Sequence, residues 1–529
     1  MIELTAAQLA ALTHGHLTST AEPGLVVALG FLVTDSRDAF PGCVYVAKPG
    51  ESADGHDFIS DAVAAGAILV LAEREVSDPT GSAYPAVVVA DAVLALGALA
   101  AEAVRMIRAA GELTVIGITG SAGKTTTKDL LADILSRLGP TVAPKGSYNG
   151  EVGVPLTVFG ADGSTRYLII EMGATGIGHI EYLASLVKPD IGVVLGVGTA
   201  HAGGFGSIEN TAQAKGELVE ALAANGTAVL NADDARVRAM ASRTAARIVN
   251  FGTGDRQAER NQGLVRGVDV TTNDEGQPEF TLQFVAEAGE ADRADRAAQA
   301  GPPGVGQADG TDGTGTKDEV ATGTSWPITS GLLGLHQVSN LLAAAAAAHA
   351  AGAPPAVIAQ SLRGQKALSR WRMERTVRGD GVTVINDAYN ANPESMRAAL
   401  RTLAELGRGS DGAEHRTWAV LGAMLELGPD SIHEHDAIGR VAVRLNISRL
   451  VVVGQQARAM HVAAVMEGSW GEESVFVPDV DAAYALLRAE LRPGDVVLFK
   501  SSNGAGLRFL GDRIALPTDG TDEGRTQIQ

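Results

Sequence analysis

Short apolar runs alternate with amphipathic segments along most of this chain. Runs rich in Val, Ile and Leu, bounded by Gly, Pro, Asn or Asp, predict buried strands. Longer segments that repeat apolar residues three and four positions apart predict helices that cover a sheet. Because strands that alternate with helices form mostly parallel sheets, the pattern predicts an α/β protein.

The 529 residues are too many for one hydrophobic core, and the pattern divides them into three units. We expect a small α/β unit at 1–110, a central unit at 111–366, a Rossmann-like, doubly wound unit at 367–516 and a polar tail at 517–529. The expected strands are 42–47, 67–71 and 86–89 in the first unit, 115–119, 167–170, 191–196 and 227–231 in the second, and 382–385, 417–421, 450–453 and 495–499 in the third. The expected helices include 92–109, 208–222, 394–406, 431–445 and 481–491.

Two segments of the central unit depart from this alternation. Pro155 and the glycines around it predict that residues 148–160 form no regular element. Residues 287–325 are rich in Gly, Ala, Asp and Thr and hold few large apolar side chains. Such a segment buries too little apolar surface to offset the cost of ordering its backbone. We predict a disordered insertion in a peripheral β region there, and no functional site.

The stretch 115–130, VIGITGSAGKTTTKDL, carries the strongest chemical signal. Its predicted strand ends in a Gly-rich turn, and Lys124, Thr125 and Thr126 open a helix. Such a turn presents backbone N–H groups, and the helix N-terminus adds partial positive charge, so the site favours a polyphosphate. Lys124 would reach the β- and γ-phosphates, and the Thr125 hydroxyl a Mg²⁺ ion. The full P-loop spacing requires Gly where this chain has Ile118, and an ordinary Gly-rich turn is the less favoured alternative.

Polar side chains also follow later strands of the central unit. Glu171 directly follows one predicted strand, and a carboxylate at the C-terminal end of a buried parallel strand faces the ligand crevice. Glu171 could therefore complete a Mg²⁺ shell with Thr125, in preference to pairing with a surface lysine. His201 lies in a Gly-rich loop after the next strand, where a metal ligand and a structural histidine are equally favoured. Lys215 lies on the following helix, and its spacing alone predicts an ordinary solvated charge.

Two polar loops of the first unit hold a further candidate site. The segment TDSR contains Ser36 and Arg37, and Lys48 begins the segment KPGESADGHDF. Loops on a rigid scaffold are where binding groups gather, but solvated turns have the same composition. An anionic ligand held by these three side chains is therefore one of two open interpretations.

Composition narrows the classes of function. The formal net charge of −20 and the lack of a basic run argue against nucleic-acid binding. The single cysteine, Cys43, excludes an intrachain disulfide and an all-cysteine metal site, and we expect it to be a small buried residue. Because no apolar run is long enough to span a membrane and no signal segment is recognised, we expect a cytoplasmic protein without a membrane span.

A series of motifs suggests a family. The chain contains, in order, GITGSAGKTTT, YNGEVGVPLT, EMGA, AHAGGFGS, AKGE, HQVSN and NDAYNANP. Together they resemble the Mur ligase family, and the resemblance covers nearly the whole chain. The segments TDSR and DGHDF resemble the UDP-sugar domain of that family. NDAYNANP and LGAMLELGPDSIHEHDAIG are similar to the members that add D-alanyl-D-alanine, and not to those that add the third residue.

The resemblance implies an ATP-dependent ligase that joins D-alanyl-D-alanine to UDP-N-acetylmuramoyl-tripeptide through an acyl phosphate, a step of peptidoglycan synthesis. It implies a UDP-sugar-binding first unit, a central P-loop ATPase-type unit, and a monomeric enzyme. ATP phosphates would be bound by Gly120, Ser121, Ala122, Gly123, Lys124, Thr125 and Thr126, and the nucleotide by Asn340, Arg372, Asp387 and Asn390. The uridine substrate would be bound by Ser36, Arg37 and Lys48.

The resemblance also implies the catalytic residues and their metals. Lys124, Glu171, His201 and Lys215 would be catalytic, and Thr125, Glu171 and His201 would hold two Mg²⁺ ions. Lys215 resembles the carbamylated lysine of the family, whose new carboxylate helps to place a Mg²⁺ ion. The chain departs from the family pattern at Gly150, Gln337 and Ala423, where Asn, Asn and an acidic residue are often found. The first two departures concern side-chain contacts and not the phosphate site, whereas Ala423 removes a dipeptide or nucleotide contact.

Two other classes of function stay open. One is a related amide ligase with a different acceptor, such as a poly-amino-acid or folate-type ligase, against which the UDP-sugar-like first unit argues. The other is a non-enzymatic, nucleotide-switched assembly module, in which Glu171, His201 and Lys215 would be incidental.

Overall fold

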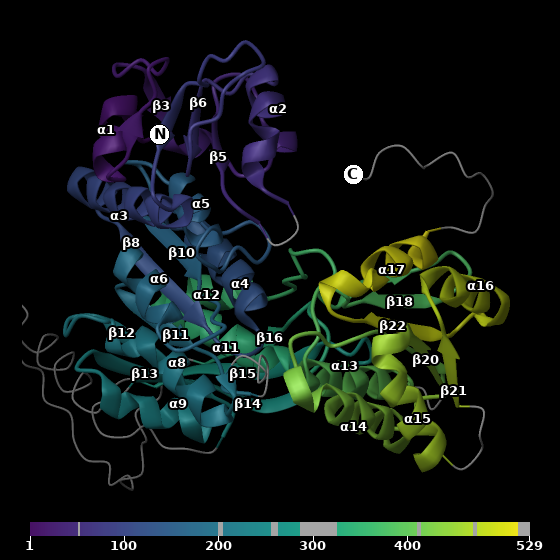
Figure 1. Ribbon diagram of the computed structural model, residues 1–529. Coiled ribbons are helices and arrows are strands. Elements are labelled where there is room, and N and C mark those ends of the chain that lie inside the picture. Colours follow the sequence, from purple (N-terminus) through teal and green to yellow (C-terminus); the bar gives the residue numbers. More distant parts are fainter. Residues whose placement is uncertain are drawn as a thin grey trace, which may run out of the picture.

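The computed structural model describes residues 1–50, 53–198, 205–254, 263–285, 325–409, 414–468 and 473–516. Within these residues, α/β sheets follow one another along the chain, and the predicted α/β class is confirmed (Figure 1). The N-terminal sheet stands above the central one in this view, and the C-terminal sheet lies beside it. No helix in the described ranges is both long enough and apolar enough to cross a bilayer.

The N-terminal unit is built on a mostly parallel sheet. In spatial order its strands are β2 (His16–Leu17), β7 (Ala86–Val88), β6 (Leu69–Ala72), β5 (Val44–Ala47) and β4 (Leu32–Val33), with β2 antiparallel. Strands β1 (Glu3–Thr5) and β3 (Val26–Ala28) form a separate antiparallel pair, and the helices are α1 (Ala6–Leu12), α2 (Ile59–Ala64) and α3 (Ala92–Ala110). Asp91 caps α3 by accepting from the N–H groups of Val93 and Leu94 at 2.8 Å. The buried face of α3 belongs to one apolar core that extends into the central unit, so α3 joins the two units.

The central unit contains an extended sheet with helices on both faces. In spatial order its strands are β16 (Ser325–Thr329), β15 (Pro278–Val285), β14 (Gly263–Thr272), β13 (Arg247–Gly252), β12 (Thr227–Asn231), β11 (Ile191–Val194), β8 (Thr114–Thr119), β10 (Tyr167–Glu171) and β9 (Thr141–Val142). In this spatial order, all the strands from β14 to β9, including β8, are parallel. Strands β15 and β16 extend the edge beyond β14 and pair in antiparallel fashion. The helices are α4 (Lys124–Ser136), α5 (Gly153–Phe159), α6 (His179–Val187), α8 (Ile208–Glu220), α9 (Ala235–Ala239), α11 (Gln337–Ala350) and α12 (Pro355–Leu362).

Alternate residues of β8 point to opposite faces of this sheet, as the two-residue repeat of a strand requires. Val115 packs in the core beneath α5, α6 and α8, whereas Ile116 and Ile118 pack in the core beneath α4, α11 and α12. The buried side chains of β8 are mostly apolar, apart from Thr119 at its end, and the alanines of α11 allow that helix to lie close to the sheet. The C-terminal end of β8 is therefore held rigidly from both sides.

One expectation for the central unit is corrected, and another lies almost wholly outside the described residues. The segment expected to be irregular forms α5, because Pro155 stands in the first turn of the helix, where its missing N–H breaks no intrahelical bond. The predicted disordered insertion, 287–325, lies outside the described residues except for Ser325. That residue begins β16 and pairs with Gln283 of β15.

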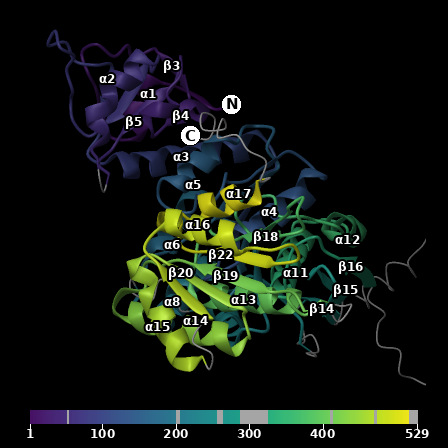
Figure 2. The ribbon, with the colours of Figure 1, turned by 90° about the vertical axis from the view of Figure 1, so that its right-hand side faces the viewer.

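The C-terminal unit is a doubly wound sheet. In spatial order its strands are β17 (Glu374–Val377), β18 (Thr383–Asn386), β22 (Val496–Lys500), β19 (Thr417–Leu421), β20 (Arg449–Val453) and β21 (Ser474–Val477), all parallel except β17. One face is covered by α13 (Pro393–Leu406), α14 (Ser431–Arg444) and α15 (Arg458–Glu467), and the other by α16 (Val480–Glu490) and α17 (Leu507–Ala515). Figure 2 shows these two layers on either side of the sheet, with the unit in front of the central one.

Candidate active site

The loop between β8 and α4 has the shape that its glycines permit. Gly123 has a φ of +84°, in the left-handed region, and a Cβ atom there would overlap Asn340 Oδ1 of α11. A Cβ atom on Gly120 would lie 2.8 Å from the Cβ atom of Leu195. Both positions therefore require glycine for steric reasons, and the loop leads directly into the N-terminus of α4.

Lys124 is the first residue of α4, and its ammonium group folds back over the loop. Its Nζ donates to the carbonyl oxygen of Gly120 at 2.8 Å. Burial lowers the pKa of Lys124, the positive charge of Arg372 adds to that effect, and the negative charge of Glu171 opposes it. The lysine is thus held where phosphate oxygens would meet the loop.

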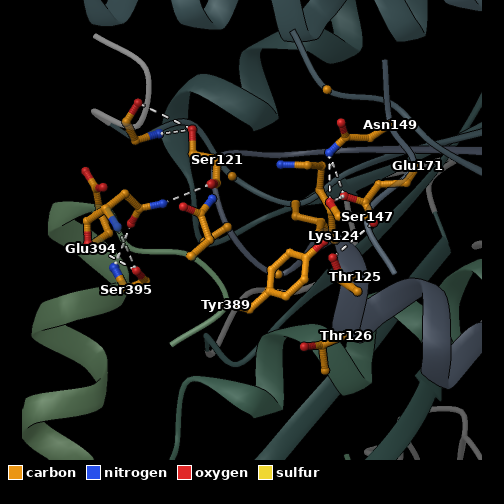
Figure 3. Close-up of a pocket in the computed structure, with 18 of the residues that line it drawn as sticks. Ser121, Lys124, Thr125, Thr126, Ser147, Asn149, Glu171, Tyr389, Glu394 and Ser395 are labelled. Atoms are coloured by element: carbon orange, nitrogen blue, oxygen red, sulfur yellow. Dashed lines mark hydrogen bonds between the residues drawn. The ribbon is translucent and has the colours of Figure 1, made fainter. Parts of the chain in front are cut away.

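Glu171 lies beside the loop because β10 and β8 are parallel neighbours in register, with Glu171 opposite Ile118. The carboxylate is 1% exposed and is fully engaged. Its Oε2 accepts from Thr125 Oγ1 at 3.0 Å, and its Oε1 accepts from Ser147 Oγ at 2.8 Å and from Asn149 Nδ2 at 3.0 Å. Figure 3 shows these side chains gathered at one side of a cavity, with Glu394 and Ser395 of α13 at the other.

The oxygen atoms of Thr125 and Glu171 are the kind of ligand that Mg²⁺ prefers. Among the described residues, no group of three or more His, Cys, Asp or Glu side chains is arranged to hold a metal ion. One carboxylate and one hydroxyl oxygen, 3.0 Å apart, suit an ion that completes its shell with phosphate oxygens and water. His201, the other predicted ligand, lies outside the described residues.

Lys215 is buried in α8, with 2% of its surface exposed, so the expectation of a solvated charge is wrong. Burial, together with the neighbouring charge of Lys124, lowers the pKa of Lys215 to about 7. The next residue, Gly216, leaves room for the Arg243 guanidinium, which donates to the carbonyl oxygens of Ala212 and Gln213 at 3.2 and 3.0 Å. These bonds fix the turn of α8 that carries the lysine.

A cavity of about 900 Å³ lies between the central and C-terminal units. Its lining includes the predicted residues Ser121, Ala122, Gly123, Lys124, Thr125, Thr126, Glu171, Asn340, Arg372, Asp387 and Asn390. The volume is within the usual range for ligand pockets, about 300 to 1,000 Å³. The predicted residues Gly120 and Lys215 do not line this cavity.

Residues of the C-terminal unit reach across the cavity to the loop. Arg372 donates from its NH2 group to Thr125 Oγ1 at 3.2 Å, and Asn392 donates from Nδ2 to the carbonyl oxygen of Ser121 at 3.2 Å. Asp387 pairs with the buried Lys500 at 2.6 Å. The two units therefore form one site, in which positive charge and backbone N–H groups face the same space.

Comparisons with known proteins agree with this geometry. Three family models match successive parts of the chain: the Mur ligase family catalytic domain at 29–104, the Mur ligase middle domain at 118–288 and the Mur ligase glutamate ligase domain at 371–503. The UDP-N-acetylmuramoyl-tripeptide–D-alanyl-D-alanine ligase of Mycobacterium tuberculosis is 46% identical over 97% of this chain and 98% of that protein. The chain belongs to the Mur ligase family.

More distant relatives bear the same name and fold. The Escherichia coli protein of that name is 32% identical to this Mur ligase over 90% of this chain and 92% of its own. The crystal structure of MurF from Acinetobacter baumannii is 27% identical and covers 97% of this chain and 99% of that one, with a TM-score of 0.77.

The three predicted residues of the N-terminal unit lie away from the cavity of this Mur ligase. Ser36 and Arg37 belong to a short 3₁₀ turn, Ser36–Asp38, after β4, and Lys48 directly follows β5. Because β4 and β5 are parallel neighbours, these residues lie at the same edge of the sheet. The Arg37 side chain is 87% exposed, and its hydrogen bonds to Asp35 lower the pKa of that carboxyl to about 2.

Sequence reasoning missed several residues of the site. Lys500 ends a buried strand just as Glu171 does, so the rule that selected Glu171 applies to it equally. Ser147 and Asn149 lie in a loop whose approach to β10 depends on the tertiary fold. Gln337, a departure from the family pattern, accepts from Asn340 Nδ2 at 2.8 Å and so orients the side chain that lies against Gly123.

Proposed function

We propose that this Mur ligase joins D-alanyl-D-alanine to UDP-N-acetylmuramoyl-tripeptide with the cleavage of ATP to ADP and phosphate, in the synthesis of peptidoglycan. The observation that carries the proposal is the meeting of the phosphate loop, Glu171 and Arg372 around one cavity between two units. Relatives that bear the name of this activity align with nearly the whole chain. A monomer that acts in the cytoplasm, where ATP is available, is part of the same proposal.

The first step forms an acyl phosphate. The terminal carboxylate of the tripeptide attacks the γ-phosphorus of ATP, and the bond to the β-phosphate oxygen breaks to release ADP. The loop N–H groups, Lys124 and Arg372 stabilise the charge on the phosphoryl oxygens. Mg²⁺ ions, one of them held by Thr125 and Glu171, would neutralise further phosphate charge.

In the second step the amine of D-alanyl-D-alanine attacks the acyl carbon. The C–N bond forms, the amine loses its proton, and phosphate leaves from the tetrahedral intermediate. Binding both reactants in one cavity contributes through proximity, which is worth about 7 to 11 kcal/mol in favourable cases. Closure of the cavity by the C-terminal unit would also protect the acyl phosphate from water.

We propose further that Lys215 reacts with CO₂ to form a carbamate, which would help to hold a second Mg²⁺ ion. The support is chemical: a pKa of about 7 leaves a large share of the buried amine neutral at neutral pH, and the neutral amine is the form that adds to CO₂. A carbamate would also replace a positive charge near Lys124 with a negative one.

The carbamate is tested by carbon NMR with ¹³C-bicarbonate and no metal. We expect one carbamate carbon resonance that is lost in Lys215→Met and kept in Lys188→Met, which removes an exposed lysine. A resonance that persists in Lys215→Met would contradict the assignment.

The overall proposal is tested with purified protein, ATP, Mg²⁺, UDP-N-acetylmuramoyl-tripeptide and D-alanyl-D-alanine, with products weighed by mass spectrometry. We expect a UDP-linked pentapeptide and one ADP for each molecule formed. Product formed only with another amino-acid acceptor would favour a related amide ligase. ATP binding without any amide product, and without an effect of Glu171→Gln, would favour a nucleotide-switched module.

A further inference from the structure

Arg372 lies at the start of the C-terminal unit and reaches the phosphate loop. The ring of Tyr389 packs against one face of its guanidinium. Its Cζ lies 4.4 Å from the centre of the Tyr389 ring, and its NH2 group donates to Thr125 Oγ1. Its Nε is buried and has no hydrogen-bond partner among the described residues. The guanidinium thus retains an unused donor beside the loop that would hold phosphate.

The backbone on both sides of Arg372 is in an unusual conformation. Trp371 has a φ of +59° and Met373 a φ of +52°, both in the left-handed region that residues other than glycine seldom adopt. Such conformations persist only where the surrounding structure over-determines them. On one side, Met373 donates its N–H to Asp387 Oδ1 at 3.1 Å, which fixes that residue.

On the other side, Trp371 is fixed by Asp512, a residue of the helix α17. The indole Nε1 donates to Asp512 at 3.0 and 3.2 Å, and the backbone N–H of Trp371 donates to Glu374 Oε2 at 2.9 Å. The indole also packs edge-on against Phe509 of α17, with ring centres 6.0 Å apart, and lies nearly parallel to the Tyr389 ring.

Asp512 is itself oriented from two other directions. Its carboxylate accepts from Arg370 at 2.9 Å and from Asn386 Nδ2, at the end of β18, at 3.0 Å. Because Asn386 immediately precedes Asp387, the same strand end fixes both anchors of the segment that carries Arg372. Helix α17 is therefore connected to the segment that carries Arg372 both through the indole of Trp371 and through the end of β18.

We propose that Trp371 and Asp512 are positioning residues, whose hydrogen bond holds Trp371 in its left-handed conformation and so aims the guanidinium of Arg372 at the transferred phosphate. This rests on the proposed function, which gives Arg372 a triphosphate to act on. Neither residue lines the cavity. Their effect on the rate acts through Arg372.

The test is a double-mutant cycle on the full chain with the ligase assay. We expect Asp512→Ala to lower kcat by about 10- to 100-fold, the scale of a small displacement of a catalytic group, with little change in the KM for D-alanyl-D-alanine. In an Arg372→Ala background, Asp512→Ala should change kcat by less than about twofold, because the two residues act as a unit. Trp371→Phe keeps an aromatic ring and loses the indole N–H, so it should lower kcat as Asp512→Ala does. If Asp512→Ala fails to fold, Trp371→Phe takes its place in the cycle.

Arg513→Ala is the matched control, because Arg513 lies on the same helix and pairs with Asp481 at an exposed site, away from Trp371. We expect its kcat to equal that of the unaltered chain. The inference would be overturned if the fold-losses of kcat in Asp512→Ala and Arg372→Ala multiplied in the double variant. It would also be overturned if thermal unfolding showed that the loss of kcat comes from a lower fraction of folded protein. Failure of the unaltered chain to form product would instead overturn the proposed function, so the two failures are distinguishable.

Discussion

Asn340 Oδ1 occupies the place that a Cβ atom on Gly123 would take. The amide is held there by Gln337, which accepts from Asn340 Nδ2, and both residues are buried at the start of α11. A helix from a distant part of the sequence thus presses against the loop where phosphate would bind. The shape of the loop depends on this contact as well as on its own glycines.

We expect Gly123→Ala to lower the affinity for ATP by at least about tenfold and to destabilise the fold by about 2 to 4 kcal/mol, since it adds a steric overlap to a left-handed backbone. Gly178→Ala is the matched control: its φ is +91°, but no atom lies within 4 Å of an added Cβ. It should cost about 1 to 2 kcal/mol and leave ATP affinity unchanged. Urea unfolding measures the stability of each variant, and calorimetric titration measures its affinity for ATP. Equal effects of the two substitutions would show that the contact with Asn340 does not determine the shape of the loop.

Glu171→Gln should raise the Mg²⁺ concentration needed for half-maximal activity by about 10- to 100-fold, because it removes the charge of the carboxylate that we propose as a Mg²⁺ ligand. Ser147→Ala, which removes one hydrogen bond to Glu171 without changing its charge, should have a smaller effect. Rates measured across a Mg²⁺ titration at saturating ATP distinguish the two variants. An unchanged Mg²⁺ dependence in Glu171→Gln would show that this carboxylate holds no metal ion.

The local parts of the site could be predicted from the sequence. The phosphate loop is a continuous segment that its glycines and lysine identify, and Glu171 follows from its place at the end of a buried strand. The expected strands at 227–231 and 417–421 match β12 and β19, and most other elements shift by one or two residues at their ends. Continuous apolar runs identify the strands because both faces of each sheet are buried, and apolar residues three and four positions apart identify the helices because one face of each packs on a sheet.

The convergence of distant segments could not be predicted in the same way. No local rule brings Arg372 to Thr125, and the left-handed φ values of Trp371 and Met373 contradict the local preference of both residues. The sequence around Lys215 predicts a surface charge, because the burial of this lysine comes from the packing of α8 on neighbouring elements. These features follow from tertiary contacts that override local preference.

His435 should make the stability of the C-terminal unit depend on pH. It is buried on α14, donates through Nδ1 to the carbonyl oxygen of Ser431 at 2.6 Å, and accepts at Nε2 from the N–H of Met424 at 3.0 Å. Burial lowers its pKa, so below the unfolded value of about 6.5 the unfolded chain binds the proton more readily than the folded one. Stability should therefore fall on acidification, by at most about 1.4 kcal/mol per pH unit.

Urea unfolding from pH 8 to pH 5 measures this dependence. His435→Gln should lose less stability over that range than the unaltered chain, although it starts less stable at pH 8. His433→Gln, which removes an exposed histidine of the same helix, should follow the unaltered chain. Parallel curves for all the proteins would contradict the assignment.

Arg37→Ala and Lys48→Ala should each raise the KM for UDP-N-acetylmuramoyl-tripeptide by about 10- to 100-fold, the usual worth of a charge-assisted hydrogen bond, with kcat nearly unchanged. The two residues lie at the same edge of the N-terminal sheet and away from the cavity, so they can affect binding without touching the reacting groups. Arg105→Ala, which breaks an exposed pair with Glu102 on α3, is the control. Unchanged KM values would place the uridine substrate elsewhere.

The pair formed by Lys500 and Asp387 should be the most sensitive ion pair of the C-terminal unit. Lys500 Nζ donates to Asp387 Oδ2 at 2.6 Å and to the carbonyl oxygen of Asn390 at 3.1 Å, and the lysine is 2% exposed. Lys500→Met leaves a largely buried carboxylate without its partner and should cost about 3 to 5 kcal/mol of unfolding free energy.

The double variant Asp387→Asn, Lys500→Met should be more stable than Lys500→Met alone, because neither charge is then left unpaired. We expect Lys500→Met to be nearly inactive and the double variant to stay so, because Asp387 and Lys500 both line the cavity and the double variant lacks both of their charges. Stability and activity are thus expected to separate: urea unfolding would show partial recovery while the ligase assay would not. If stability and activity both recovered, the ion pair would act only through stability. If the double variant were no more stable than Lys500→Met, the unpaired carboxylate would not be the reason that Lys500→Met is destabilised.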